Sequence, residues 1–438
     1  MPAAPRTPAP RAWIGAVAAM FACGWGGNQF TPLLLMYRQQ AGYSAVTVDA
    51  FLAAYVLGLV PGLLLGGPLS DRLGRKPLML AGSAASLVAS GVLAAGVFGQ
   101  VPIYAGRMLT GIALGIAMAV GTSWVKELSQ APYDPSAEPG TGARRASLGL
   151  TLGLGLGAGV AGALAQWGPW PMVLPYGVHM LVALAGLVAL AKVPETRARP
   201  AAPNGFLADL KVPSAGHRRF LRVVLPMAPW VFGSTGIAYA VMPQIVEKQV
   251  GDWGLAYATL LTVLTLGTGA LIQPFAKRLG ARSTARAIVL AMLLMALGMA
   301  VCAVDAVLLS PWLALAAAVL LGAAYGIALV SGLLEIQRIA GPDDLAGLTG
   351  VYYALTYTGF MAPPVLAALS AVVPYVAMFA FLTLLALGCL AVIAGSTRVP
   401  AAPAGTPAPP VAEGGPRHGA EESTGEAAEE HSEQGAVR

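Results

Sequence analysis

The sequence has little charge. Only 11% of its 438 residues are Asp, Glu, Lys or Arg, and 57% are hydrophobic, whereas a soluble globular domain is about 25% charged. A chain of this length and composition is expected to cross a membrane many times. Its 54 glycines agree with this, because membrane helices use small residues where they pack closely.

Residues typical of metal, redox and catalytic sites are also scarce. The three cysteines, Cys23, Cys302 and Cys389, lie in separate apolar runs, so no disulfide framework or zinc site is expected. The sequence has no HExxH, GxSxG or phosphate-binding GxxxxGK[ST] motif. We therefore expect no enzyme activity and no cofactor. Any transport would draw on a proton gradient or on the substrate's own gradient.

Apolar segments of about 20 residues, enough to cross the hydrocarbon core of a bilayer, recur along the chain. The first is too long for the core of a signal peptide. We predict an all-α membrane protein with twelve transmembrane helices at residues 13–36, 47–69, 77–98, 102–125, 146–166, 172–193, 221–245, 254–276, 285–304, 311–334, 345–369 and 373–396.

The basic residues orient these helices. With the N-terminus inside, 23 of the 26 Lys and Arg residues fall in inside segments, Arg38 and Lys248 fall outside, and Arg107 lies within a helix. Such asymmetry is typical of membrane proteins. We expect both termini in the cytoplasm and the protein in the cell membrane as a monomer. The positive charge is no argument for nucleic-acid binding.

A repeat divides the chain. Residues 273–282, QPFAKRLGAR, align with residues 67–76, GPLSDRLGRK, and each stretch follows the second helix of its half. This predicts two pseudo-symmetric six-helix bundles. The expected parts are a cytoplasmic tail at 1–12, bundles at 13–193 and 221–397, a cytoplasmic linker at 194–220, and a disordered acidic tail at 398–438.

The stretch at 67–76 resembles the signature G-x-L-a-D-r-x-G-r-k of the major facilitator superfamily of secondary transporters. Residues 194–197, PETR, look like the ending that this family often has after its sixth helix. The glycine-rich residues 153–162 are similar to an antiporter pattern, but Ala158 stands where that pattern has proline. The resemblance implies a transporter and leaves the substrate open.

Charges around the signature suggest a conformational latch. Gly74 permits a tight turn, and we expect Arg75 to pair with Glu127. The resemblance implies that Asp71 contacts the start of the eleventh helix, near residues 343–348. The predicted latch consists of Gly67, Asp71, Arg72, Gly74, Arg75, Lys76 and Glu127.

Ionisable residues at membrane depth are candidates for proton coupling. Arg107 either faces a central cavity or snorkels outward, and Asp49 either exchanges protons and pairs with Arg107 or lies among headgroups. We interpret His179 as a packed, hydrogen-bonded histidine. Asp305 and Glu335 are interpreted as surface charges at helix ends.

Polar and aromatic residues on the helices that the resemblance places around a central cavity are candidates for substrate contacts. They are Trp25, Asn28, Gln29, Trp230, Tyr239, Tyr325 and Tyr357. Such a cavity suits an amphiphilic or drug-like molecule. The preferred hypothesis is a proton-coupled exporter whose partners are lipid, protons and a small molecule. An importer or facilitator, and a non-transporting membrane receptor, remain alternatives.

Overall fold

The structure, a computed structural model, describes residues 11–138, 140–197, 212–341 and 345–398. All regular secondary structure in these ranges is helical. Contacts divide the chain into Met1–Arg398 and Val399–Arg438. The expected acidic tail and the centre of the 194–220 linker lie outside the described residues.

The first half contains eight α-helices and three shorter turns. In chain order these are α1 (Trp13–Asn28), the 3₁₀ turn η1 (Thr31–Leu33), α2 (Leu34–Ala41), α3 (Ala45–Leu73), α4 (Arg75–Ala94), the 3₁₀ turn η2 (Ala95–Phe98), α5 (Gln100–Ile116), the π-helical η3 (Ala117–Gly121), α6 (Thr122–Leu128), α7 (Thr141–Trp167) and α8 (Leu174–Ala191).

The second half also consists of α-helices with short 3₁₀ and π-helical stretches, and its first long segment contains the π-helical η5 and η6. Its elements are η4 (Pro213–Gly216), η5 (Phe220–Val224), α10 (Leu225–Gly236), η6 (Ile237–Val241), α11 (Met242–Ile245), α12 (Glu247–Val250), η7 (Gly251–Trp253), α13 (Gly254–Arg282), α14 (Thr284–Leu308), α15 (Pro311–Ile339), α16 (Leu345–Thr358), η8 (Gly359–Met361), α17 (Ala362–Leu369) and α18 (Tyr375–Arg398).

Ten helical segments of the described residues are long and apolar enough to cross a membrane, and they coincide with ten of the twelve predicted spans. The other two predicted spans, 13–36 and 345–369, are not among these ten continuous segments. The 3₁₀ turns η1 and η8 interrupt them. Pro32 and Pro363 lie at these breaks, where proline lacks the N–H that would continue an α-helix.

Glycines let two pairs of helices pack with their backbones almost in contact. A Cβ atom added to Gly58 of α3 would lie 2.0 Å from the Met108 carbonyl oxygen of α5, and one added to Gly111 would lie 2.1 Å from the Tyr55 carbonyl oxygen. In the second half, Gly326 of α15 stands in the same relation to Gly269 of α13, at 2.2 Å. Each half therefore contains a close helix contact made possible by small residues.

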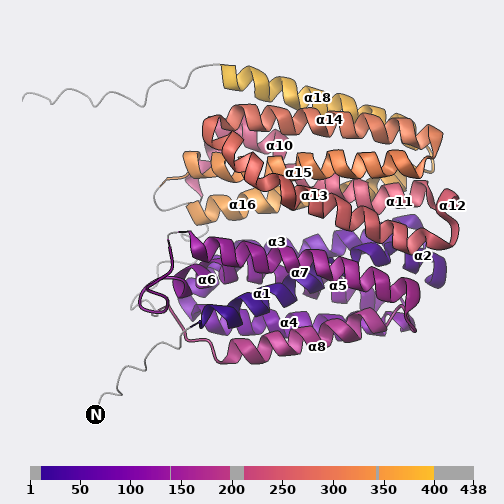
Figure 1. Ribbon diagram of the computed structural model, residues 1–438. Helices are drawn as coiled ribbons and strands as arrows, with labels where there is room; N and C mark the ends of the chain where they lie inside the picture. Colours follow the sequence, from indigo (N-terminus) through magenta and orange to yellow (C-terminus); the bar gives the residue numbers. More distant parts are fainter. Residues whose placement is uncertain (1–10, 139, 198–211, 342–344, 399–438) are drawn as a thin grey trace, which may run out of the picture. The chain divides into compact units, whose positions relative to one another are not determined.

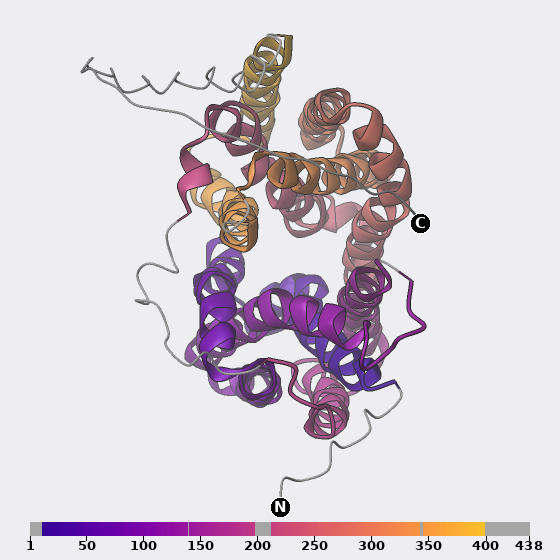
Figure 2. The same ribbon diagram turned by 90° about the vertical axis from the view of Figure 1, so that its left-hand side faces the viewer.

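Helices of the same half pack together, and the halves meet mainly along α3 with α16 and α17, and along α7 with α13 (Figures 1 and 2). We call the end where α3 meets α4 the basic end, at the left of Figure 1. The end where α2 meets α3 is called the opposite end.

Candidate functional site

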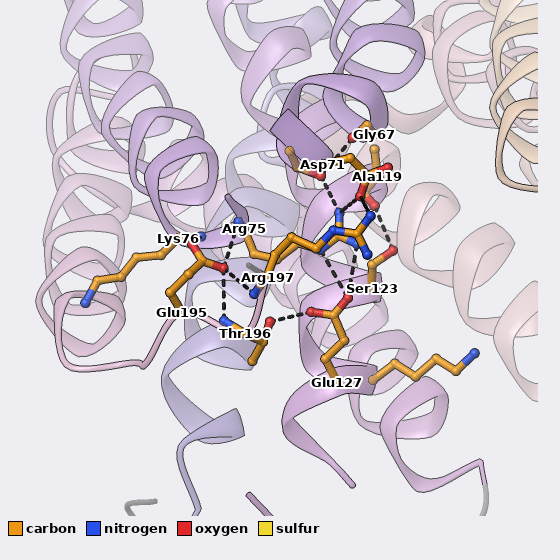
Figure 3. Close-up of polar contacts among 12 residues, drawn as sticks. Gly67, Asp71, Arg75, Lys76, Ala119, Ser123, Glu127, Glu195, Thr196 and Arg197 are labelled. Carbon is orange, nitrogen blue, oxygen red and sulfur yellow. Dashed lines mark hydrogen bonds and ion pairs between the residues drawn. The ribbon is translucent and has the colours of Figure 1, made fainter. Parts of the chain in front are cut away.

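At the basic end, Arg75 ties the turn between α3 and α4 to the end of α6. Its Nε and Nη2 donate to Oε1 of Glu127, at 3.2 and 3.0 Å. Its Nη1 lies 3.0 Å from Oδ1 of Asp71 and also donates to the Ser70 hydroxyl. Arg75 is only 8% exposed, so these contacts compensate a charge that is almost out of water (Figure 3).

Three residues that follow the last helix of the first half, Glu195, Thr196 and Arg197, complete this cluster. The Glu195 carboxylate accepts the backbone N–H of Arg75 at 3.0 Å and of Lys76 at 2.9 Å, which caps the N-terminus of α4. The Thr196 hydroxyl donates to Glu127, and Arg197 Nη2 lies 3.5 Å from Asp71 Oδ1 (Figure 3). We call residues 70–76, Glu127 and 195–197 the turn cluster.

The geometry of the turn cluster tests the contacts expected of the latch. The ion pair between Arg75 and Glu127 is confirmed, and Gly74 has the positive φ of +103° that favours glycine. Lys76 Nζ donates to the Ala191 carbonyl at 2.7 Å. The ion pairs of Asp71 in the described part of the chain are with Arg75 and Arg197 of its own half, while residues 342–344 lie outside that part.

At the opposite end, the Gln244 amide is among the side chains that bridge the two halves. Gln244 of α11 donates from Nε2 to Oδ1 of Asp49, at 3.2 Å, and its Oε1 accepts from Nη1 of Arg38, at 3.1 Å. Arg38 also lies 3.4 Å from Oε2 of Glu247. Asp49 is only 1% exposed, so it lies inside the contact between the halves. We call Arg38, Asp49, Gln244 and Glu247 the bridging network.

A cavity lies between the halves. Its lining comes from both of them, and six of its thirteen residues are aromatic: Gly27, Asn28, Thr31, Leu52, Tyr55, Arg107, Leu154, Phe232, Tyr239, Leu266, Tyr325, Tyr357 and Phe360. Its free volume is about 30 Å³, enough for one or two water molecules. The described state is therefore nearly closed around this space.

Arg107 carries the single charge of the described cavity lining. The side chain is fully buried, which rules out snorkelling to the surface in this state. The guanidinium carbon lies 4.5 Å from the ring centre of Phe30 and 4.4 Å from that of Tyr55, and Nε donates to the Phe51 carbonyl at 3.3 Å. Its Nη1 has no hydrogen-bond partner.

The model of the Major Facilitator Superfamily matches residues 13–242, more than half of the chain. The chain belongs to the Major Facilitator Superfamily. Together with the ten long apolar helices, this membership makes it a multi-pass membrane protein. A protein of Bacillus subtilis (strain 168) named "Uncharacterized MFS-type transporter YceJ" is 25% identical over 273 residues, which are 62% of this chain and 64% of that relative.

A shorter similarity links this superfamily member to a "Chloramphenicol resistance protein" of Pseudomonas aeruginosa, 40% identical over 65 residues, 15% of this chain and 16% of that one. The chain thus aligns with less than two thirds of either relative. Among solved structures, a POT family transporter in complex with 5-aminolevulinic acid gives a TM-score of 0.72 at 13% identity, covering 88% of this chain and 95% of that one. A D-xylose-proton symporter gives 0.66 at 17% identity, covering 88% and 95%. These likenesses show the shared fold alone.

The cavity of this superfamily member contains four of the seven residues that the sequence suggested: Asn28, Tyr239, Tyr325 and Tyr357. The other three, Trp25, Gln29 and Trp230, are not among the lining residues of this cavity in the described state. Gln29 turns to α4, where Nε2 donates to the Ser90 hydroxyl at 3.0 Å. The Trp25 backbone packs against Gly157 of α7. Trp230 precedes the cavity residue Phe232 by two positions, about 200° around the helix.

Several cavity and interface residues were missed, among them Tyr55, Phe232, Phe360 and Gln244. They lie in apolar runs whose composition does not mark one face as different from another. The available signals were the aromatic residues of the seventh and eleventh predicted helices and a lone glutamine in an apolar segment. The proposed pair of Arg107 and Asp49 makes no ion pair in the described part of the chain, because Asp49 is held by Gln244.

Three other buried polar groups serve structure. His179 lies in a chain of hydrogen bonds: its Nε2 donates to the Ala22 carbonyl at 2.9 Å, and its Nδ1 lies 2.6 Å from the Ser90 hydroxyl. This confirms a hydrogen-bonded histidine. The interpretation of Glu335 and Asp305 as surface charges is wrong, because both are fully buried. Glu335 pairs with Arg219, and Asp305 accepts the backbone N–H of Ser310 at 2.7 Å.

Proposed function

We propose that the protein is a secondary active transporter of the plasma membrane that exports a small amphiphilic or drug-like molecule or metabolite in exchange for protons. The observation that carries this proposal is an aromatic cavity with one buried cation, lined by residues from both halves. The relative named for chloramphenicol resistance supports export. We further propose a monomer with both termini in the cytoplasm, driven by the proton gradient without a cofactor.

Alternating access would work through the two polar ends. In the described state the bridging network holds the halves together at the opposite end. At the basic end, the described ion pairs of Asp71 remain within the first half. We propose that the opposite state breaks the bridging network, exposes Asp49 to protons and lets it approach Arg107. The turn cluster, with Gly67, Arg72 and Lys76, then acts as a latch against the second half.

Asp49→Asn tests proton coupling. The variant would be reconstituted into proteoliposomes. We expect its rate of chloramphenicol transport driven by a pH gradient to be at least about tenfold lower than that of the natural protein, because asparagine cannot exchange a proton. Chloramphenicol counterflow, which needs no net proton movement, should persist. Uptake and internal pH would be followed with labelled chloramphenicol and a pH-sensitive dye.

The matched control is Asp252→Asn, because Asp252 is an exposed acid at the same end, and it should behave as the natural protein does. Wild-type transport that ignores the pH gradient would contradict proton coupling, and accumulation in the direction of import would contradict export.

Asp71→Asn tests the latch. The substitution removes the charge that faces Arg75 and Arg197 without removing bulk. We expect turnover to fall about three- to tenfold while KM stays within about twofold, because Asp71 lies in the turn cluster and not in the cavity lining. Asp134→Asn is the control, since Asp134 pairs with Arg145 at the same end. Unchanged turnover of the Asp71 variant would argue against a latch.

A further inference from the structure

The charge of Arg107 has no counter-charge in the described cavity. No acid is among the residues that line this space, and no ion pair of Arg107 exists in the described ranges. Two aromatic faces and one carbonyl oxygen contact the guanidinium. An isolated cation at membrane depth costs at least about 2.5 kcal/mol. Such a group is expected to have a functional partner that the empty cavity does not contain.

Several other polar groups of the lining already have partners within the protein. Asn28 donates from Nδ2 to the Leu154 carbonyl at 3.0 Å, and its Oδ1 accepts the Thr31 hydroxyl at 2.8 Å. The Tyr357 hydroxyl points at the Met118 sulfur, 3.5 Å away. Among the described lining residues, the unpartnered buried polar atom is Arg107 Nη1. The free hydrogen-bonding capacity of the cavity therefore includes a cationic donor, beside the hydroxyls of its tyrosines.

The rest of the lining favours a flat, apolar body. Phe232 stacks on Tyr357, with ring centres 4.2 Å apart, and on Phe360, at 5.2 Å. Tyr55 meets Tyr357 edge-on at 6.3 Å. A further ring can join such a cluster by stacked or edge contacts. Because the described lining has one cation and no acid, it matches a ligand with a single negative charge.

We propose that the substrate is a small aromatic monocarboxylate, whose carboxylate accepts a hydrogen bond from Arg107 Nη1 and whose ring lies among Tyr55, Phe232 and Tyr357. This inference rests on the transport function proposed above and specifies its substrate class. The cavity must widen to admit the ligand, which fits a state that is nearly closed. The charge-assisted hydrogen bond supplies specificity, and the aromatic cluster supplies apolar contact.

Four probes test this on the unmodified full-length protein in detergent micelles: benzoate, benzamide, benzylamine and acetate. They separate the charge from the ring. Binding would be measured by the shift of the melting temperature and by equilibrium binding of labelled benzoate. We expect benzoate to bind at least about tenfold more tightly than each of the others, because only benzoate has both features. Equal binding of benzamide, or tighter binding of benzylamine, overturns the proposal.

Variants locate the binding. Arg107→Gln should weaken benzoate binding about 10- to 100-fold. Arg107→Lys keeps the charge but not the planar guanidinium, so its affinity for benzoate should lie between those of the natural protein and Arg107→Gln. Arg222→Gln removes the same charge from an exposed position and should leave binding unchanged. If Arg107→Gln does not fold, binding of the four probes to the natural protein still tests whether the protein prefers an aromatic carboxylate. Benzoate binding that is unaffected in a folded Arg107→Gln protein overturns the assignment.

Transport separates this inference from the function on which it rests. If pH-driven chloramphenicol transport occurs but benzoate neither binds nor competes, the transporter stands and the aromatic carboxylate is refuted. If benzoate binds through Arg107 and no labelled benzoate or chloramphenicol crosses the proteoliposome membrane, the binding site stands and the transport function is refuted.

Discussion

Gly111→Ala should destabilise the protein by roughly 3 kcal/mol, at the upper end of the usual cost of overpacking. The new methyl group would lie 2.1 Å from the Tyr55 carbonyl oxygen and 2.7 Å from the Leu59 nitrogen of α3. Both are backbone atoms, so no side chain can rotate away, and α3 and α5 must separate. The displacement would also reach Tyr55 and Arg107, which lie on these helices and line the cavity. Loss of the monodisperse gel-filtration peak at a lower temperature would measure the effect.

Gly155→Ala is the matched control for this prediction. Gly155 lies within the long helix α7, and a Cβ atom added there meets nothing within 4 Å. Alanine favours a helix over glycine by about 1 kcal/mol, so this variant should match or exceed the natural protein's stability. Gly111→Ala and Gly155→Ala variants of equal stability would refute the close backbone contact between α3 and α5.

Arg219→Gln should cost roughly 3 kcal/mol of stability. It leaves the fully buried Glu335 carboxylate with the Thr284 hydroxyl, which donates to it at 2.8 Å, as its remaining described partner. Removing one member of a buried ion pair costs about 3–5 kcal/mol. The lower end applies because the Arg219 side chain is itself 35% exposed. Thermal unfolding in detergent, followed by loss of helical circular dichroism, would report the change.

Two companion variants make the measurement of this ion pair specific. The double variant Arg219→Gln with Glu335→Gln should recover most of the lost stability, since no uncompensated charge then remains buried. Arg222→Gln, three positions further along and exposed, should have little effect. A double variant as unstable as Arg219→Gln alone would show that the arginine acts through packing and not through charge.

The membrane spans and the turn at residues 67–76 were predictable because both are local. Hydropathy over about 20 residues marks a span, and residues 67–76 carry the charges and the glycine that the turn requires. The breaks at η1 and η8 were not predicted, because Pro32 and Pro363 occur in runs that are otherwise as apolar as the continuous helices. The pairing of Arg75 with Glu127 could be predicted because both residues lie at the ends of neighbouring helices.

The cavity was only half predictable, because its geometry depends on helix rotation. Asn28 and Gln29 are adjacent polar residues, yet about 100° of rotation sends one to the cavity and the other to Ser90 on α4. In a helix that is apolar all round, composition does not fix this rotation. The link of Asp49 to Gln244 joins residues 195 positions apart. Glu335 was misjudged because a helix end in sequence is not always a surface in space.

The capping of α4 by Glu195 has a consequence for how the protein is made. The residues that complete the turn cluster follow α8, the last helix of the first half, and are synthesised about 120 residues after Arg75. Until they leave the ribosome, the start of α4 lacks its cap, Asp71 lacks Arg197, and Glu127 lacks Thr196. The turn cluster therefore needs the whole of the first half and, among its described contacts, nothing from the second.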